Sequence, residues 1–428
     1  MPMEPIFALL VLLALAGTPL FVVILGAAMA GFHALGVDLQ VVAIELYRMA
    51  DTPVLAALPL FTFAGYLLGE SRTSERLVRL TRVFLGWMPG GLAVVAFVTC
   101  ALFTAFTGAS GVTIVALGAL LLPALREAGY GERFSMGLVT TSGSLGLLLP
   151  PSLPLILYGI VAQQLDAGTS VALDDLFLAG LLPGLLMVLM LSGWSLWAHR
   201  AVAMPTTKFS WWEAGAALRA AAWEIPLPFV VLGGIYGGVL ALSEAAAATA
   251  LYVLIVEVAI YREIPLRELP GVMRDSMTMV GGILVILGVS MASTNVLIDA
   301  EAPAKLFALI RLHVTDRWVF LILLNVLLLV LGAILDIFSA IVIMVPLILP
   351  VAVGYGVHPL HLGIVFLANM QIGYVTPPVG MNLFIAGYRF RRPVTELYRA
   401  ALPFTLVLLV AVLMITYWPW LTLALVGG

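Results

Sequence analysis

Apolar runs long enough to cross a membrane follow one another along almost the whole chain. The hydrocarbon core of a bilayer is about 30 Å thick, so a spanning helix needs about 20 apolar residues. A soluble domain carries about 25% charged residues, whereas only 10% of these 428 residues are charged. We therefore predict an all-α polytopic membrane protein with room for roughly a dozen spanning segments. The runs cover residues 5–32, 53–69, 134–162, 176–198, 225–242, 245–260, 277–298, 319–335, 340–353, 362–388 and 401–426.

The charge and cysteine content exclude several other classes. The formal net charge is −3, so the basic surface of a nucleic-acid-binding protein is absent, and no nucleic-acid partner is expected. The single cysteine, Cys100, excludes an internal disulfide and a cysteine-based zinc site. The run 5–32 lacks the preceding Lys or Arg of a cleavable signal peptide, so we expect it to form one retained first helix.

The basic residues sort into groups that predict the orientation of the chain. Positive charge is retained on the cytoplasmic side of membrane loops. Arg48, Lys305, Arg311 and Arg317 are expected on the outer side. The other 16 of the 20 basic residues are expected to face the cytoplasm, in the groups Arg72, Arg76, Arg79, Arg82, Arg126 and Arg133; Arg200, Lys208 and Arg219; Arg262, Arg267 and Arg274; and Arg389, Arg391, Arg392 and Arg399.

The stretch 92–125 is flanked on both sides by these cytoplasmic groups. It must therefore enter and leave the membrane on the same side. It divides at Thr107-Gly-Ala-Ser-Gly111 into arms of about 14–15 residues, or roughly 22 Å each at 1.5 Å per residue. Such arms predict a re-entrant hairpin whose tip lies inside the membrane. The alternative is two short spanning helices joined by a glycine-rich outer loop.

A sequence repeat with an offset of 227 residues relates two parts of the chain. The pattern Gly-x-x-x-Pro-Pro occurs at 146–151 and again at 373–378, and each copy follows a proline 23 residues before its glycine. The same offset predicts a second hairpin over 319–353, with its tip near Asp336. Its flanks are poor in Lys and Arg, so it should open outward. We therefore predict two halves, 1–215 and 216–428, related as an inverted-topology repeat like those of many secondary transporters.

Each Gly-x-x-x-Pro-Pro pattern lies inside an apolar run, 134–162 or 362–388. Proline removes a backbone donor and disfavours helix before it, so both helices should be broken there. Broken backbone at membrane depth is tolerated only where it is buried in protein or lines a cavity. The freed carbonyls can coordinate a cation, and the half-helix N-termini can face an anion. The alternative is a simple proline kink.

Polar residues gather near the predicted tips and breaks. Most Ser and Thr in such helices bond to their own helix. Asp336 is a stronger candidate because an acidic group inside the membrane is costly and marks function by default; its alternative role is a helix cap. The others are Thr107, Ser110, Thr113, Thr140, Thr141, Ser142, Ser144, Ser152, Ser339, Asn369, Gln371, Thr376 and Asn382.

The sequence offers little for catalysis, and we expect no enzyme activity. Gly108-Ala-Ser-Gly111 resembles the surroundings of an intramembrane serine nucleophile, which needs a base within hydrogen-bond reach. The five histidines all fall at run ends or in loops. Zinc-protease and Walker-type ATP motifs are absent, so transport should be driven by an ion gradient.

Taken in order, the motifs resemble the large membrane (DctM-type) permease subunit of a tripartite ATP-independent periplasmic (TRAP) transporter. The resemblance covers nearly the whole chain. It departs at the first tip, where the family usually has Ser-Gly-Ser-Ser and this chain has Thr107-Gly-Ala-Ser110, with one hydroxyl fewer. The matching stretches are Pro59-Leu-Phe-Thr-Phe-Ala-Gly65, Glu75-Arg-Leu-Val-Arg79, 107–118, 123–158, Gly233-Gly-Ile-Tyr-Gly237, Glu244-Ala-Ala-Ala247, Asp336, 346–350 and Thr376-Pro-Pro-Val-Gly-Met-Asn-Leu-Phe384.

This resemblance implies an elevator-type importer of organic acids, driven by sodium and without an organic cofactor, in the inner membrane of a bacterium or archaeon. It implies two protein partners: an extracytoplasmic substrate-binding protein, and a small four-helix membrane subunit, expected here as a separate chain. The carboxylate substrate would lie near Thr107, Thr113, Ser152 and Asn382. Sodium would bind where each tip meets its break, at Gly108, Ser110, Gly111, Gly146, Leu149 and Pro151 in one half and at Leu335, Asp336, Gly373, Thr376 and Pro378 in the other.

Two other functions remain open on the sequence. A stand-alone divalent-anion/sodium symporter also uses inverted hairpins and would transport without a binding protein. A structural subunit of a membrane complex would use the broken helices for assembly and not for transport.

Overall fold

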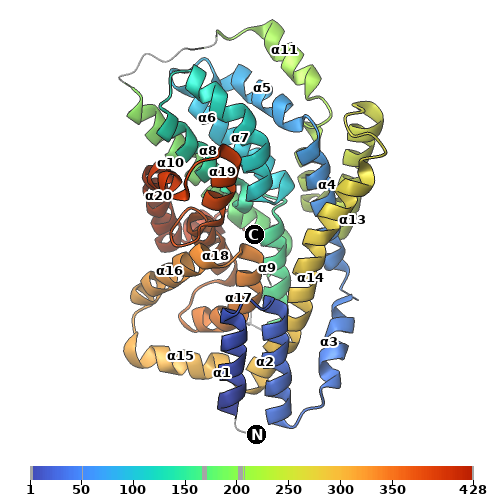
Figure 1. Cartoon of the computed structure of the whole chain (residues 1–428), viewed down its shortest axis with the longest axis vertical. Coiled ribbons are helices and arrows are strands. Elements are labelled where there is room, and N and C mark those ends of the chain that lie inside the picture. The colour runs from blue at the N-terminus through green and yellow to red at the C-terminus, as the bar shows by residue number, and fades with distance from the viewer. Residues whose placement is uncertain (1–2, 51, 166–170, 201–205, 207, 427–428) are drawn as a thin grey trace.

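The computed structural model describes residues 3–50, 52–165, 171–200, 206 and 208–426, and every regular element in these ranges is a helix (Figure 1). Up to residue 220 the helices are α1 (Met3–Leu15), α2 (Leu20–Leu35), α3 (Gln40–Ala50), the 3-10 helix η1 (Pro53–Ala56), α4 (Ala57–Glu70), α5 (Thr73–Leu85), α6 (Gly91–Thr107), α7 (Ser110–Glu127), α8 (Glu132–Ser142), the 3-10 helix η2 (Leu145–Leu148), α9 (Leu153–Gln163), α10 (Leu173–Ala198) and α11 (Trp211–Ala220).

The remaining helices follow in the same chain order. They are α12 (Pro226–Tyr236), α13 (Leu242–Leu254), its π-helical continuation η3 (Ile255–Ile260), α14 (Leu269–Asp299), α15 (Ala302–His313), α16 (Arg317–Ile334), α17 (Ile337–Gly354), α18 (Pro359–Gly373), α19 (Met381–Phe390), α20 (Val394–Tyr417) and α21 (Trp420–Leu423).

Eight helices in the described ranges are long and apolar enough to cross a membrane, and the bent combination of α8, η2 and α9 makes a ninth. This is fewer than the dozen predicted. The difference arises because several apolar runs form shorter helices of 10–17 residues, among them α2, α6, α12 and α18.

The prediction of one first helix over 5–32 is wrong. The run forms two helices, α1 and α2, because the chain turns between them at Gly17-Thr-Pro19. Gly17 has a φ of +86°, a conformation that favours glycine, and proline then precedes the first residue of α2. Each helix alone is too short to cross a bilayer comfortably.

Four helices, α3, α5, α11 and α15, were not anticipated from the apolar runs. Each carries charged residues, so none forms a continuous apolar stretch. Helix α5 is a clear case: its buried residues include Leu77 and Thr81, whereas Arg79 and Arg82 are exposed. Amphipathic helices of this kind lie along a membrane surface or against other helices.

The 227-residue offset found in the sequence also relates the helix boundaries. Helices α7 and α17 begin and end 227 residues apart, and the bounds of α6 and α16 agree within one residue. The starts of α8 and α18 have the same offset, as do the ends of α9 and α19. Local structure thus repeats along with the proline and glycine pattern.

Ion pairs bring the basic groups expected on the cytoplasmic side together. Arg76 pairs with Glu263, next to the group around Arg262, and Arg79 pairs with Glu213 of α11 at 2.8 Å. Glu132 pairs with both Arg126 and Arg392. Helices α5 and α11 lie at one end of the molecule, and α3 and α15, which carry outer-group residues, lie at the opposite end (Figure 1).

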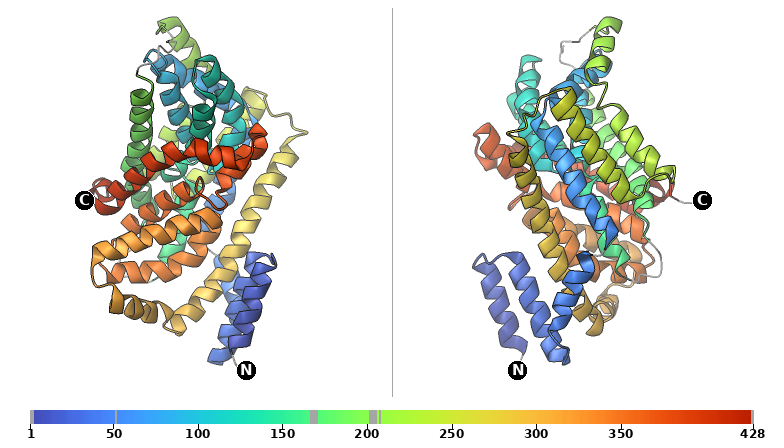
Figure 2. Two further views of the ribbon diagram at one scale, coloured as in Figure 1. Left: turned by 60° about the vertical axis from the view of Figure 1, so that its left-hand side comes forward. Right: turned by 90° about the vertical axis from the view of Figure 1, so that its right-hand side faces the viewer.

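The most buried helices are those that carry the breaks. Every residue of α18 is buried, and so are ten of the eleven residues of α9. Helix α14 runs along the side of the molecule, where α2 packs against it through Phe32 and Val296 (Figure 2). The breaks are therefore held in the protein interior, as broken backbone at membrane depth requires.

Candidate functional site

The first tip, between α6 and α7, is fastened to the first Pro-Pro break. Gly108 ends α6 with a φ of +65°, and a Cβ there would lie 2.6 Å from the Leu153 side chain at the start of α9. Thr104 of α6 donates a hydrogen bond to the carbonyl of Gly143 at 2.9 Å. Tip and break therefore form one packed unit.

The second tip, between α16 and α17, is fastened to the second break. The backbone N–H groups of Val379 and Gly380 donate to the carbonyl of Ala333 at 3.2 and 3.1 Å. The N–H of Ile337 donates to the Tyr374 hydroxyl at 2.7 Å. The chain that follows Pro377-Pro378 thus lies directly against the tip. Both Pro-Pro bonds, in this break and in the first, are cis.

Glycines make the same close contact in both units. A Cβ at Gly146 would overlap the backbone of Ala101 and Ala105 in α6. A Cβ at Gly373 would overlap the backbone of Gly332 in α16. Gly146 and Gly373 are 227 residues apart, as are Ala105 and Gly332. The glycine of each Gly-x-x-x-Pro-Pro pattern therefore allows a helix of the tip to approach the break without a side chain between them.

The two breaks also meet each other at the centre of the molecule. The Ser144 hydroxyl donates to the carbonyl of Gln371 at 3.4 Å, and these residues too are 227 apart. Helix α7 packs against α19, since a Cβ at Gly111 would lie 2.9 Å from the Ile385 side chain. Each unit is consequently joined to the other at its tip helix and its break.

Several buried polar atoms near the tips and breaks have no hydrogen-bond partner among the described residues. Asn382, at the start of α19, is fully buried, and both polar atoms of its amide are unpaired. The hydroxyls of Thr107 and Thr141 and the side-chain amide oxygen (Oε1) of Gln371 are also unpaired. A buried polar group without a partner is costly, so these atoms are candidates for contact with a polar ligand.

Three other predicted residues use their hydroxyls locally. Thr113 contacts Thr104 at 2.7 Å, within the first hairpin. Ser152 donates to the Leu147 carbonyl at 2.5 Å, and Thr376 donates to that of Ile372 at 2.8 Å. Their side chains therefore stabilise the hairpin and the breaks.

Asp336 is a helix cap in this structure. One of its oxygens accepts hydrogen bonds from the backbone N–H groups of Phe338 and Ser339, both at 3.0 Å, at the start of α17. Asp336 is partly exposed, and a carboxylate has more than one acceptor oxygen. Capping therefore leaves acceptor capacity at the tip.

The remaining predicted residues lie in or beside the same two units. Ser110 and Gly111 begin α7, and Leu149 and Pro151 lie between η2 and α9. Leu335 precedes Asp336 at the second tip. Pro378, with its neighbours Pro377 and Val379, is exposed, whereas Pro150 and Pro151 are buried. The second break is thus the more accessible of the two.

Asn369 lies away from the tips. Its amide donates to the Asn325 side chain of α16 at 2.6 Å, and Thr416 of α20 donates to the same oxygen at 3.1 Å. These buried contacts link α16, α18 and α20.

Sequence reasoning missed some residues that shape the site. Gly65 of α4 lies against the first tip, where a Cβ would come within 2.7 Å of the Thr107 Cα. Thr104 and Tyr374 tie each tip to its break. Only the 227-residue repeat could have indicated Thr104 and Tyr374, since Thr104 precedes the matched residue Ala105 and Tyr374 follows the matched residue Gly373. The contact of Gly65 depends on packing between distant segments.

No group of three or more His, Cys, Asp or Glu residues that could hold a metal ion occurs in the part of the chain that the structure describes. The oxygens gathered at the two units are backbone carbonyls, hydroxyls, amides and the Asp336 carboxylate. Such hard oxygen donors suit alkali and alkaline-earth cations, whereas transition metals prefer His and Cys.

Solved structures share this arrangement of helices. A structure titled as the Alcanivorax borkumensis YdaH transporter superposes with a TM-score of 0.62 and 15% identity, covering 91% of this chain and 89% of that one. The Neisseria gonorrhoeae MtrF structure, titled as an antimetabolite efflux pump, superposes with a TM-score of 0.54 and 13% identity, covering 89% and 84%. The chain therefore has the fold of a polytopic helical membrane transporter.

The chain belongs to the family described as the DctM component of tripartite ATP-independent periplasmic transporters, whose model matches residues 6–421. The C4-dicarboxylate TRAP transporter large permease protein DctM of Rhodobacter capsulatus is 33% identical, over 98% of each chain. The ectoine/5-hydroxyectoine large permease UehC of Ruegeria pomeroyi is 30% identical, over 98% and 97%. The protein is thus a multi-pass inner-membrane permease and not an enzyme.

Proposed function

We propose that this chain is the large permease of a sodium-coupled importer that carries an organic acid delivered by an extracytoplasmic binding protein. The observation that carries this proposal is the pair of matching units. In each, a glycine-mediated contact fastens a hairpin tip to a Pro-Pro break. Secondary transporters place ions and substrate where such interrupted helices meet.

The two units are related as an inverted-topology repeat with halves 1–215 and 216–428. The matching helix bounds support this relation, as does the hydrogen bond between Ser144 and Gln371, because residues related by a two-fold axis touch where they lie on it. Substrate crosses by an elevator movement of the two re-entrant hairpins and their broken helices.

The arms of the first hairpin are longer than the sequence predicted. Helices α6 and α7 have 17 and 18 residues, whereas arms of about 14–15 residues were expected.

Sodium fits the donor set at the junction of each tip with its break. Near the first tip lie the carbonyls of the broken segment and the unpaired hydroxyl of Thr141, and Asp336 lies at the second tip. The breaks leave carbonyl oxygens outside regular helix, which are the ligands that a weakly held cation uses. The charge of Asp336 favours a cation at the second tip.

The substrate's carboxylate lies between the tips, near Thr107 and Asn382. The unpaired amide of Asn382 can donate to an anion, and Thr107 can donate its hydroxyl. The starts of α9 and α19 lie against the first and second tips, so two helix N-termini add favourable potential for negative charge. Because relatives of this chain are named for C4-dicarboxylate and for ectoine, an organic acid is the expected class of substrate.

The transporter is completed by a small membrane subunit and the binding protein. The isethionate permease DctMQ of Oleidesulfovibrio alaskensis is 32% identical to 98% of this chain, but the match spans only 65% of that protein. We propose that the part of that relative beyond the match corresponds to a small membrane subunit, and that a subunit of this kind also works with this permease.

Uptake into proteoliposomes tests the function. Permease reconstituted with its small subunit, and supplied with the cognate binding protein and labelled organic acid, should accumulate substrate only under an inward sodium gradient. Uptake that is unchanged when sodium is replaced by potassium would refute the coupling. Uptake without a binding protein would instead indicate a stand-alone symporter.

Substitutions at Asp336 separate its charge from its role as a cap. Asn caps helices about as well as Asp, so Asp336→Asn should preserve the thermal stability of the protein. We expect it to weaken the apparent sodium affinity about tenfold, equivalent to about 1.4 kcal/mol. Asp336→Ala should lose both stability and affinity. Normal sodium dependence in both variants would restrict Asp336 to a structural role.

A further inference from the structure

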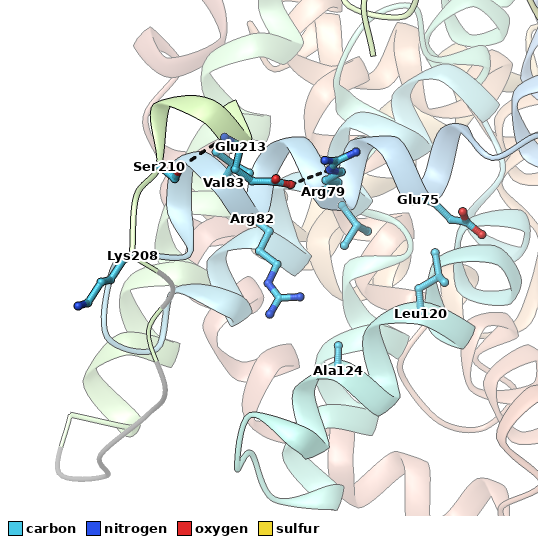
Figure 3. A pocket seen from close by; sticks show the side chains of 10 residues that line it. Glu75, Arg79, Arg82, Val83, Leu120, Ala124, Lys208, Ser210 and Glu213 are labelled. Carbon is cyan, nitrogen blue, oxygen red and sulfur yellow. Dashed lines mark hydrogen bonds and ion pairs between the residues drawn. The ribbon is translucent and has the colours of Figure 1, made fainter. Parts of the chain in front are cut away.

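A cavity of about 470 Å³ opens between α5, α7 and the start of α11 (Figure 3). Val78 and Val83 of α5, with Leu120 and Ala124 of α7, form apolar walls. A second cavity of about 180 Å³ shares Arg82 and Ala124 with the first, so the two adjoin at these residues. Together the two cavities offer room for part of an elongated molecule with an apolar portion along α5 and α7.

The two cavities are lined by three basic side chains, Arg79, Arg82 and Lys208, and by three acidic ones, Glu75, Glu127 and Glu213. Arg79 pairs with Glu213 at 2.8 Å, whereas Arg82 and Lys208 form no ion pair with any residue that the structure describes. Arg82 extends from α5 toward Ala124, and Lys208 lies at the margin and points outward (Figure 3). Arg82 is therefore available to an anionic group at the place where the two cavities meet.

Exposed aromatic residues surround the same place. Trp211 and Trp212, at the start of α11, are 82% and 85% exposed, and Trp87, just after α5, is 55% exposed. Phe209 contacts both Phe84 and Trp211, with ring centroids 6.3 and 4.9 Å apart. Tryptophan gathers at the boundary between lipid tails and headgroups, so exposed tryptophans beside the cavity favour a position at headgroup depth.

We propose that this cavity binds an anionic phospholipid of the cytoplasmic leaflet, with the phosphate at Arg82, Lys208 at its margin and an acyl chain along α5 and α7. Phospholipid fits because the cavity combines apolar walls, a basic residue free to pair and an aromatic rim. The sorting of the basic groups along the sequence predicts that this end of the molecule faces the cytoplasm. That leaflet attracts basic residues through its anionic lipids.

A corresponding cavity of about 450 Å³ offers an internal comparison. It lies between α15 and α17, which flank α16 along the chain as α5 and α7 flank α6, and Phe307 and Pro350 help to line it. The charged residue that lines it is Glu301, and no basic residue is among its lining residues. It should therefore show no preference for anionic lipid.

Native mass spectrometry of the permease purified with its small subunit tests the proposal. The complex is mixed with equal amounts of phosphatidylglycerol and phosphatidylcholine, and the ratio of the two bound lipids is measured. A basic residue near an anionic surface is worth about 1 kcal/mol, or roughly fivefold. Arg82→Gln should lower the preference for phosphatidylglycerol by about that factor, and Lys208→Gln by less. Arg219→Gln, an exposed arginine of α11 that does not line the cavity, should leave it unchanged.

Filling the cavity gives a second, independent measurement. Ala124→Leu should reduce retention of both lipids, because the added side chain occupies the place of the acyl chain. An equal loss of preference in Arg82→Gln and Arg219→Gln would overturn the site, as would wild-type protein without any preference. Displacement of the lipid by millimolar inorganic phosphate would indicate a site for soluble anions. If Arg82→Gln released the small subunit but left lipid binding unchanged, this surface would be a protein interface.

Discussion

Alanine at Gly146 or Gly373 is expected to reduce sodium-driven uptake to less than a tenth of the wild-type rate. A Cβ at Gly146 would lie 2.7 Å from the Thr104 Cβ and overlap the α6 backbone, and a Cβ at Gly373 would lie 2.8 Å from the Ala333 nitrogen. Backbone atoms cannot rotate away as a side chain can. Tip and break must therefore move apart. We expect the cost in folding free energy to lie near the upper end of the roughly 1–3 kcal/mol that overpacking typically costs.

Gly193→Ala is the matched control for these two variants. Gly193 is an exposed residue within α10, and a Cβ there meets nothing within 4 Å. Alanine should be tolerated there and should stabilise the helix by roughly 0.5–1 kcal/mol. Uptake and the thermal unfolding midpoint would be measured for all three. If Gly146→Ala and Gly373→Ala resembled Gly193→Ala in both measurements, the close tip-to-break contact would have no role.

Replacing Arg76 with glutamine is expected to cause the largest loss of folding stability. Its guanidinium pairs with Glu224, Glu257 and Glu263 and lies 4.0 Å from the centre of the Tyr261 ring. The Arg76 side chain is 11% exposed and that of Glu257 is fully buried. Without the guanidinium, three carboxylates would face one another in a largely buried place. Removing one partner of a buried ion pair costs about 3–5 kcal/mol.

Arg79→Gln provides the comparison, because Arg79 lies one turn further along α5. Its partner Glu213 and Arg79 itself are both nearly half exposed, so the loss should not exceed about 1 kcal/mol. Thermal unfolding of the purified complex would report both changes. The double variant Arg76→Gln with Glu224→Gln should recover part of the stability, because one uncompensated charge is removed. Equal unfolding temperatures for Arg76→Gln and Arg79→Gln would show that the cluster is not stabilising.

Much of the helical organisation could be predicted because apolar runs and proline patterns act locally. The break near Pro150-Pro151 and the turn between α16 and α17 at Asp336 both lie where the sequence predicted them. Local reasoning failed where charge interrupts an amphipathic helix, as in α5. It also failed at the first run, because Gly17 and Pro19 outweigh the surrounding apolar residues.

The candidate site was predictable in its components but not in how each side chain is used. The sequence could place Thr113, Asn369 and Asn382 near membrane depth, but could not rank them. In the folded protein Thr113 bonds to Thr104 and Asn369 bonds to Asn325, whereas the amide of Asn382 is unpaired. Hydrogen-bond partners come from other helices, so only packing decides which polar atoms remain available.

The sequence by itself determined the membrane environment, the family and the 227-residue repeat, because hydrophobicity, proline and glycine impose constraints that act within about one helix length. Tertiary structure alone decided three further features. It brought Arg76 to three distant glutamates, placed Gly65 against the first tip and left Arg82 unpaired at a cavity. These contacts join residues up to 187 positions apart, and their energies depend on burial and distance, which no local pattern specifies.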